Sequence, residues 1–209
     1  LSRVYGQMGV IYYQQNLISR QLSVLAKAEK YALLANDTMA AMSDYWQKCN
    51  AYEWVGNTRA AISVLDTLAS FYKSRSMSES YARALGRSIP MLIATGNTAK
   101  AMSYISIYER LSGLFDNHGD IAQGREIYYF HKGILCLKQN SLDSAEFYFR
   151  KELHDGKDYN NQNAASKGLY MLYDMMHMAD SAAKYAIYSY AMNDSVYAQM
   201  ETETIGQMA

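Results

Sequence analysis

Apolar residues recur along this chain at spacings of three and four residues, in helix-length segments that end in short polar turns. This spacing predicts amphipathic helices. Several of the segments end alike, as in QMGVIYYQQN, KCNAYEWVGN, SIPMLIATGN and KGILCLKQN. Gly and Asn tolerate the left-handed backbone that closes a helix, so these endings predict turns between successive helices. The predicted turns align on Asn16, Gly56, Gly96, Asn140 and, less clearly, His177, at intervals of 40, 40, 44 and 37 residues.

The helix after each turn has a pattern of its own. A small residue lies five positions past the turn in most repeats, and a larger apolar residue follows four positions later. Small side chains at that place allow two antiparallel helices to approach closely, and the spacing of four is a helical period. The small residues are Ala61, Ala101, Ala145 and Ala182, with Gln21 in the first repeat, and the larger residues are Leu25, Leu65, Ile105 and Phe149.

These positions resemble the tetratricopeptide repeat (TPR), which has an aromatic residue, Leu-Gly and Tyr on its first helix and Ala and Phe on its second. The resemblance implies an all-α fold, a right-handed superhelical solenoid of about five antiparallel helix pairs. The spacing is nearer 40 than the usual 34 residues, and the proline common at the end of a unit is missing. Longer second helices and connections explain both departures. The residues that carry the match are Tyr5, Met8, Gly9 and Tyr12, then Tyr45, Cys49 and Tyr52, then Leu85, Ile89 and Leu92, then Tyr129, Gly133 and Cys136, and finally Leu169 and Tyr173.

We expect one repeat domain over residues 1–209, with a further helix after the fifth pair. The predicted units span about 2–37, 38–77, 78–117, 119–158 and 161–192. Asn193 or Asp194 is predicted to cap a C-terminal helix over 193–209, which either caps the stack or connects it to a following module. The chain begins with Leu1, so we expect it to be a piece of a longer protein.

Composition supports a helical binding module and argues against several other functions. The chain has one proline, and 20 basic residues balance 20 acidic ones. A nucleic-acid-binding face would need a basic excess, so we expect no direct nucleic-acid contact. No apolar run reaches the length of a membrane span, so we expect none within this segment. The sequence has no phosphate-binding loop, nucleophile motif or metal-ligand spacing, so we expect no catalytic residues, no metal and no cofactor, and no enzyme activity.

In the TPR family the first helices line a concave groove that binds peptides, and the resemblance places a groove here. Its lining is aromatic and apolar with few charges, which suits a peptide or protein helix with a hydrophobic anchor. Arg83 and Arg87 lie one turn apart near Gln47, which is half of the set with which some family members hold a terminal carboxylate; solvated arginines are the alternative. Pro90 is predicted to kink its helix. The predicted groove residues are Tyr13, Trp46, Gln47, Asn50, Glu53, Arg83, Arg87, Pro90, Phe130, Ile134, Lys167 and Met171.

The sequence therefore favours a protein- or peptide-binding scaffold. Its long Tyr-rich units also resemble, more softly, bacterial TPR regions that act as input domains of membrane-associated transcriptional regulators or sensor kinases. That resemblance implies a sensory role and an extracytoplasmic (periplasmic) location, whereas a free adaptor would be cytoplasmic. Two alternatives remain open: a small-molecule sensor that uses the aromatic groove around Trp46, Pro90 and Phe130, and a homodimer or other homo-oligomerisation module.

Overall fold

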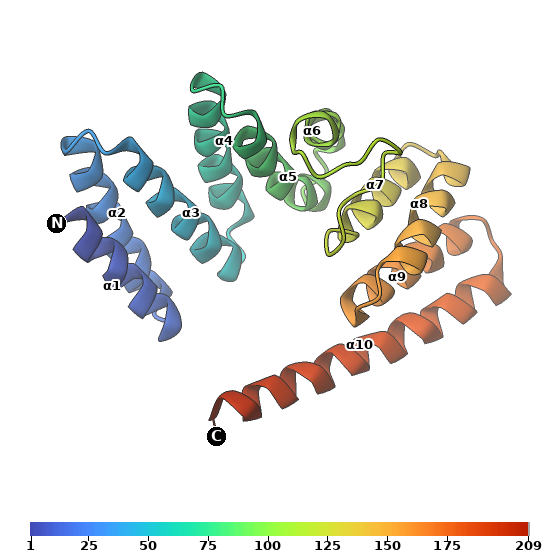
Figure 1. Cartoon of the computed structure of the whole chain (residues 1–209). Coiled ribbons are helices and arrows are strands. Elements are labelled where there is room, and N and C mark those ends of the chain that lie inside the picture. Colours follow the sequence, from blue (N-terminus) through green and yellow to red (C-terminus); the bar gives the residue numbers. More distant parts are fainter. Residues whose placement is uncertain (209) are drawn as a thin grey trace. The chain divides into compact units, whose positions relative to one another are not determined.

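The computed structural model describes residues 1–208, and the side chains of residues 1–201. Ten helices account for most of this part of the chain, in antiparallel succession (Figure 1). They form two compact units, Leu1–Gly113 (unit 1) and Leu114–Ala209 (unit 2). The helices are α1 Ser2–Gln14, α2 Ile18–Leu34, α3 Thr38–Trp54, α4 Thr58–Ser74, α5 Ser78–Ala94 and α6 Thr98–Leu111 in unit 1, and α7 Ile127–Lys138, α8 Leu142–Asp155, α9 Tyr159–Met175 and α10 Ala179–Met208 in unit 2.

The turn inside each helix pair closes in the same way, which confirms the repeat pattern. All five predicted turn residues have a positive φ, between 56° at Asn16 and 78° at Gly96. The residue after each turn residue donates its N–H to the carbonyl five residues earlier, as Asn57 does to Tyr52 at 2.8 Å. This is the Schellman arrangement, and it satisfies a carbonyl that the end of the helix leaves free.

The second helices α4 and α6 begin with a side-chain cap. Thr58 and Thr98 are the first residues of these helices. Asn57 and Asn97 precede them, and their side chains accept the N–H groups of the third helical residues at 3.2 and 3.3 Å. Asp37 caps α3 in the same way, accepting the N–H of Ala40 at 3.0 Å. An amide or carboxylate oxygen placed here binds one of the free N–H groups at a helix start.

The core of unit 1 is built from the positions that carry the repeat. Ala61 and Ala101 are fully buried, and so are Leu25, Leu65 and Ile105 four residues after their small positions. One cluster joins Leu65 and Leu68 of α4 to residues of α2, α3 and α5. Each buried Leu or Ile stabilises the fold by roughly 1.5–3 kcal/mol relative to an exposed one, so these positions dominate the packing.

Unit 2 packs around the fully buried ring of Phe149 on α8. Gly133 of α7 and Gly168 of α9 face this ring from two helices, and a Cβ added at either glycine would lie 2.4 Å from a ring carbon. The two glycines therefore make room for the aromatic side chain. One turn further along α8, Glu152 is also fully buried; its carboxyl oxygens make no well-formed hydrogen bond, and only the Phe130 backbone acts to lower its pKa. Burial, with the negative charges of Asp158 and Glu126 adding to it, raises the pKa of Glu152 to about 9.

A loop precedes α7 in unit 2. A single antiparallel bridge pairs Phe115 with Ile121, and Asp116 accepts backbone N–H groups at 2.8 Å on one side chain oxygen. The Tyr129 hydroxyl on α7 accepts the N–H of Ile121 at 3.0 Å. The ring of Phe115 packs edge-on against Tyr128, with centroids 4.9 Å apart. The loop therefore covers one side of α7.

The separate C-terminal helix predicted over 193–209 is instead the second half of α10, which continues to Met208; residue 209 lies outside the described part. Asn193 is inside this helix, and its side chain pairs with Asn163 of α9 at 3.4 Å rather than capping a new helix. Ser189 also donates to Asn163, at 2.7 Å. These contacts hold α10 against α9 across the point where a break was expected.

Candidate functional site

The predicted groove residues of unit 1 meet in a cluster between α3 and α5. Arg87 donates from Nε and Nη2 to the two carboxylate oxygens of Glu53, both at 2.8 Å. The guanidinium carbon of Arg87 lies 5.7 Å from the centre of the Trp46 ring, and Trp46 Nε1 donates to the Tyr72 hydroxyl at 2.9 Å. The Cys49 thiol also donates to Glu53, at 3.2 Å. A bidentate, charge-assisted pair next to an aromatic face is a rigid arrangement.

The charges of this cluster stabilise one another. Burial alone would raise the pKa of Glu53, but the hydrogen bonds from Arg87 and Cys49 lower it below its usual value. The same bond to Glu53 raises the pKa of Arg87. Burial and the neighbouring carboxylate raise the pKa of the Cys49 thiol to about 12. Cys49 is therefore a thiol at neutral pH and not a nucleophile, because thiolate reactivity needs a lowered pKa.

Beside this cluster lies an exposed aromatic pair. Tyr13 of α1 packs edge-on against Trp54 of α3, with ring centroids 6.4 Å apart and an interplanar angle of 73°. Tyr13 is 45% exposed and Trp54 is 62% exposed. Asn50 is exposed on α3, between Trp46 and Trp54. Tyr13, Asn50, Glu53, Trp54 and Arg87 are called the first-helix face of unit 1 below. Sequence reasoning missed Trp54, although it directly follows the predicted Glu53.

The predicted carboxylate-binding set does not assemble as drawn from the sequence. Arg83 pairs with Glu79 of its own helix at 3.3 Å, and both side chains are mostly exposed. The guanidinium of Arg87 already binds the carboxylate of Glu53. Gln47 is turned toward α1, where its side-chain oxygen is buried without a partner and lies 3.4 Å from the place of a Cβ on Gly9. Pro90 is half buried within α5, which continues through it.

The four predicted groove residues of unit 2 have different surroundings. Ile134 is only 6% exposed, so it is a core residue of unit 2 and is not available to a ligand. Phe130 is half buried, with its ring 6.0 Å from that of Phe149. Lys167 and Met171 are exposed on α9, one turn apart. Of the three hydrophobic residues among these four, only Met171 is exposed.

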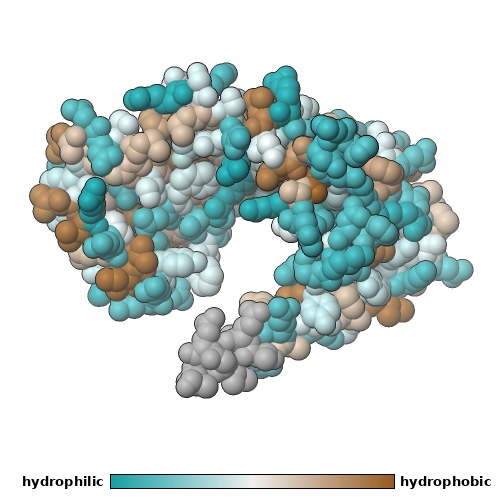
Figure 2. Space-filling view, viewed as in Figure 1, coloured by the Kyte–Doolittle hydropathy of each residue, from teal (hydrophilic) through white to brown (hydrophobic). Residues whose placement is uncertain are grey.

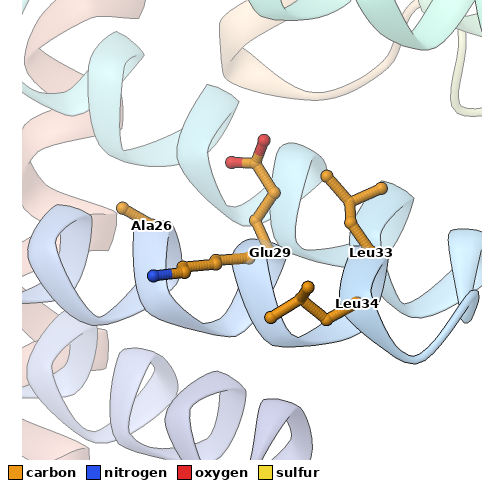
Figure 3. Close-up of a pocket in the computed structure, with 5 residues that line it drawn as sticks. Ala26, Glu29, Leu33 and Leu34 are labelled. Atoms are coloured by element: carbon orange, nitrogen blue, oxygen red, sulfur yellow. The ribbon is translucent and has the colours of Figure 1, made fainter.

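Three other features of the described residues bear on function: metal-binding groups, membrane spans and surface hollows. Among residues with described side chains, no group of three or more His, Cys, Asp and Glu residues is arranged to hold a metal ion. None of the described helices combines the length and hydropathy that crossing a membrane requires. A hollow of about 450 Å³ lies along α2, lined by Ala26, Glu29, Lys30, Leu33 and Leu34 (Figure 3). Its carboxylate, Glu29, is already bound by Tyr45 at 2.6 Å and by Lys48.

Solved structures similar to this chain include proteins with TPR-like repeats. A Podosopora anserina protein described as a kinesin light chain with nearly identical TPR-like repeats aligns with a TM-score of 0.66 and 11% identity, over 93% of this chain and 95% of that chain. A variant of that protein aligns over the same shares with a TM-score of 0.67. This chain has a TPR fold. The MamA RS-1 ArsTM double mutant is also similar to it, with a TM-score of 0.65 and 13% identity over 93% and 95% of the two chains.

The TPR likeness is one of structure rather than of sequence. No protein-family model matches this chain, and no curated protein matches it. The repeat positions nevertheless behave as the TPR pattern requires: the small positions Ala61, Ala101 and Ala145 are fully buried. Within the TPR fold of unit 1, the first-helix face is contributed by α1, α3 and α5, the first helices of three successive pairs.

Proposed function

We propose that this chain is a protein- or peptide-binding scaffold without catalytic activity, and that the first-helix face of unit 1 is its binding surface. The observation that carries the proposal is the contact between Tyr13 and Trp54, two large aromatic side chains from neighbouring first helices that remain exposed. Exposed aromatic residues with a polar group beside them are the usual anchors of protein interfaces. Asn50 supplies that group, since its amide can both donate to and accept from a peptide backbone.

The same geometry supports a preference for an apolar or aromatic anchor over an acidic one. Arg87 carries the positive charge of the face, and Glu53 already binds it through two hydrogen bonds. An incoming carboxylate would have to displace Glu53, which would leave a half-buried carboxylate without its partner. A hydrophobic side chain that packs on Trp54 meets no such obstacle.

The test is a peptide-display selection against the purified chain, followed by titration of the selected peptides. Trp46 and Trp54 are the chain's two tryptophans, so binding at this face changes intrinsic fluorescence without a label. We expect Trp54→Ala to weaken the selected peptides at least tenfold, as truncation of an interface anchor does. Phe147→Ala is the matched control, because Phe147 is a 59% exposed aromatic residue in unit 2. Equal weakening by both variants, or peptides that bind Trp54→Ala as tightly as the unchanged chain, would contradict the proposal.

We further propose that binding at this face serves as the input of a signalling or transcription regulator. The support is the sequence alone, in its long Tyr-rich repeats with NDT and DSA segments at helix starts. The check is whether a selected peptide changes the output of a fusion that carries a kinase or DNA-binding module after these residues. An output that is the same with and without peptide would count against this role. Sedimentation velocity of the same sample tests the homodimer alternative.

A further inference from the structure

A carboxyl group is buried between α1 and α3 without a hydrogen-bond partner. Asp44 on α3 is 4% exposed, and its Oδ2 atom has no partner among the described residues. Its Oδ1 atom lies 3.3 Å from the place that a Cβ on Gly6 of α1 would take, so α1 covers it. Figure 2 shows hydrophobic side chains at the surface over the part of unit 1 that contains α1. Here an acid is buried while apolar groups are exposed, although aspartate is rarely buried unless it is paired.

A second unpartnered oxygen lies beside Asp44 on α3. Gln47 follows three residues later, and its buried Oε1 atom lies 3.4 Å from the place of a Cβ on Gly9 of α1. Residues three apart on a helix are neighbours, so both oxygens face α1 at successive turns. Gly6 and Gly9 let the two helices approach closely here. Within the described residues neither oxygen receives a donor, and a proton on Asp44 would supply one.

The charged groups around Asp44 do not compensate a negative charge on it. Lys48 of α3 favours the carboxylate, but Lys48 is bound to Glu29 of α2, whose negative charge opposes that effect. Arg3, the one charged residue of α1, is exposed. Burial therefore dominates, and it raises the pKa of Asp44 to about 6 from an ordinary value of 3.8.

The next repeat shows that packing does not require an acid at this place. The residue of α5 that corresponds to Asp44, 40 positions later, is Ala84. Ala84 is fully buried and belongs to a hydrophobic cluster with Leu68 and Tyr72 of α4. A small apolar side chain therefore serves the same position in the same fold. Asp44 costs stability when it is ionised, so we looked for what its ionisation would change.

We propose that Asp44 is a proton switch: its protonated form holds α1 against α3, and its ionised form draws water between the two helices and separates them. A buried ion without a partner is strongly unfavourable, and hydration removes that penalty. The same two helices carry Tyr13 and Trp54, two turns beyond the glycines and Gln47. The switch therefore controls the aromatic contact of the first-helix face. As regulation of binding, this inference rests on the proposed function of that face.

The direction of the switch follows from which arrangement binds the proton more tightly. With α1 closed on α3 the pKa of Asp44 is about 6, whereas a hydrated Asp44 has the ordinary value of 3.8. The closed arrangement is therefore favoured at low pH. Its advantage is fully present below pH 3.8 and is lost as the pH rises from there through about 6. Each pH unit in this window changes the ratio of closed to open chains about tenfold, or roughly 100-fold across the window.

The test is fluorine NMR of the whole chain, labelled with 5-fluorotryptophan and titrated from pH 4.5 to 8. The Trp54 signal is identified by its absence in Trp54→Phe. We expect this signal to shift with a midpoint at or just below pH 6, because the contact with Tyr13 loosens. Asp44→Asn cannot ionise, so its Trp54 signal should keep the low-pH position throughout. Asp44→Ala, which copies Ala84 of α5, should behave in the same way and serves as a second variant.

Asp37→Asn is the matched control. Asp37 is an exposed acid that caps the same helix, and asparagine caps a helix equally well, so this variant should titrate like the unchanged chain. A Trp54 signal that stays constant from pH 4.5 to 8, or one that titrates equally in Asp44→Asn, would overturn the switch.

Peptide titrations separate the switch from the proposed function. A peptide selected on the whole chain is titrated at pH 5 and pH 7. We expect its affinity for the unchanged chain to be at least tenfold lower at pH 7, and its affinity for Asp44→Asn to be the same at both. Equal affinity of the unchanged chain at both pH values would overturn control of binding by Asp44. A Trp54 signal that titrates as expected in a chain that selects no peptide would support the switch and contradict the proposed function.

Discussion

Replacing the buried carboxyl of Glu152 with an amide should stabilise unit 2 at neutral pH. Glu152→Gln keeps the shape of the side chain but removes its titration. In the folded chain the pKa of Glu152 is raised to about 9 from an ordinary value of 4.5 by burial, with Asp158 and Glu126 adding to the effect. Folding at pH 7 therefore requires the carboxyl to take up a proton that the unfolded chain has lost. The amide has no such requirement.

The size of the effect follows from the difference between the two pKa values. The folded state holds one proton more than the unfolded state between pH 4.5 and 9, so the free energy of unfolding falls by about 1.4 kcal/mol for each pH unit across this window. The contribution of the protonated carboxyl is fully present below pH 4.5 and is lost as pH rises toward 9. Glu152→Gln should thus raise the free energy of unfolding by about 3 kcal/mol at pH 7, and by only about 1 kcal/mol at pH 5.

Urea unfolding followed by far-ultraviolet circular dichroism at pH 5, 6 and 7 measures this difference. Tryptophan fluorescence reports on unit 1, where both tryptophans lie, and shows whether the change is confined to unit 2. Glu146→Gln is a control for which a change in stability of the opposite sign is expected. Hydrogen bonds from Tyr173 and Arg150 lower the pKa of Glu146, so its replacement should destabilise, with the largest loss above its usual pKa. A Glu152→Gln curve that runs parallel to that of the unchanged chain from pH 5 to 7 would refute the reasoning.

Three further substitutions test a close helix contact, a helix cap and an ion pair. Gly168→Ala places a Cβ 2.4 Å from the Phe149 ring and should lower the free energy of unfolding by about 1–3 kcal/mol in urea titrations; an unchanged midpoint would mean that the ring can move aside. Asn57→Ala removes the cap of α4 and should cost about 1 kcal/mol, measured by thermal unfolding, unless water replaces the cap fully. Arg87→Ala should raise the pKa of Glu53 in an NMR titration, and a Glu53 pKa that stays low would show that Arg87 is not its cause.

Much of the fold could be predicted because turn and cap chemistry is local. Asn16 and Gly56 were identified as turn residues from their own tolerance of the left-handed backbone, and both have a positive φ. The break expected at Asn193 was wrong for a tertiary reason. An Asn before a helical pattern predicts a cap, but here Asn163 on α9 binds the Asn193 side chain inside a continuous helix. No local signal distinguishes the two outcomes.

The candidate site could be predicted residue by residue but not as an arrangement. The repeat register placed Trp46, Glu53 and Arg87 on first helices, where the structure has them. That Glu53 and Arg87 bind each other depends on the approach of α3 and α5, and residues 34 positions apart give no sign of it in the sequence. The register likewise placed Ile134 on the groove, whereas its contacts within unit 2 bury it. Side-chain direction at the edge of a groove follows from packing rather than from spacing.

The ion pair between Glu29 of α2 and Lys48 of α3 bears on the order in which the helix pairs stack during folding. Repeats of similar length risk stacking in the wrong order during folding, a characteristic failure of repeat proteins. In this chain Lys48 of α3 pairs with an acid on α2, Glu29, whereas the equivalent residue on α4 is Ala69. If the face of α3 that contacts α2 docked on α4 instead, Lys48 would be buried without a counter-ion. The Glu29–Lys48 pair therefore disfavours stacking of α3 on α4, at a place where an apolar contact alone would serve stability.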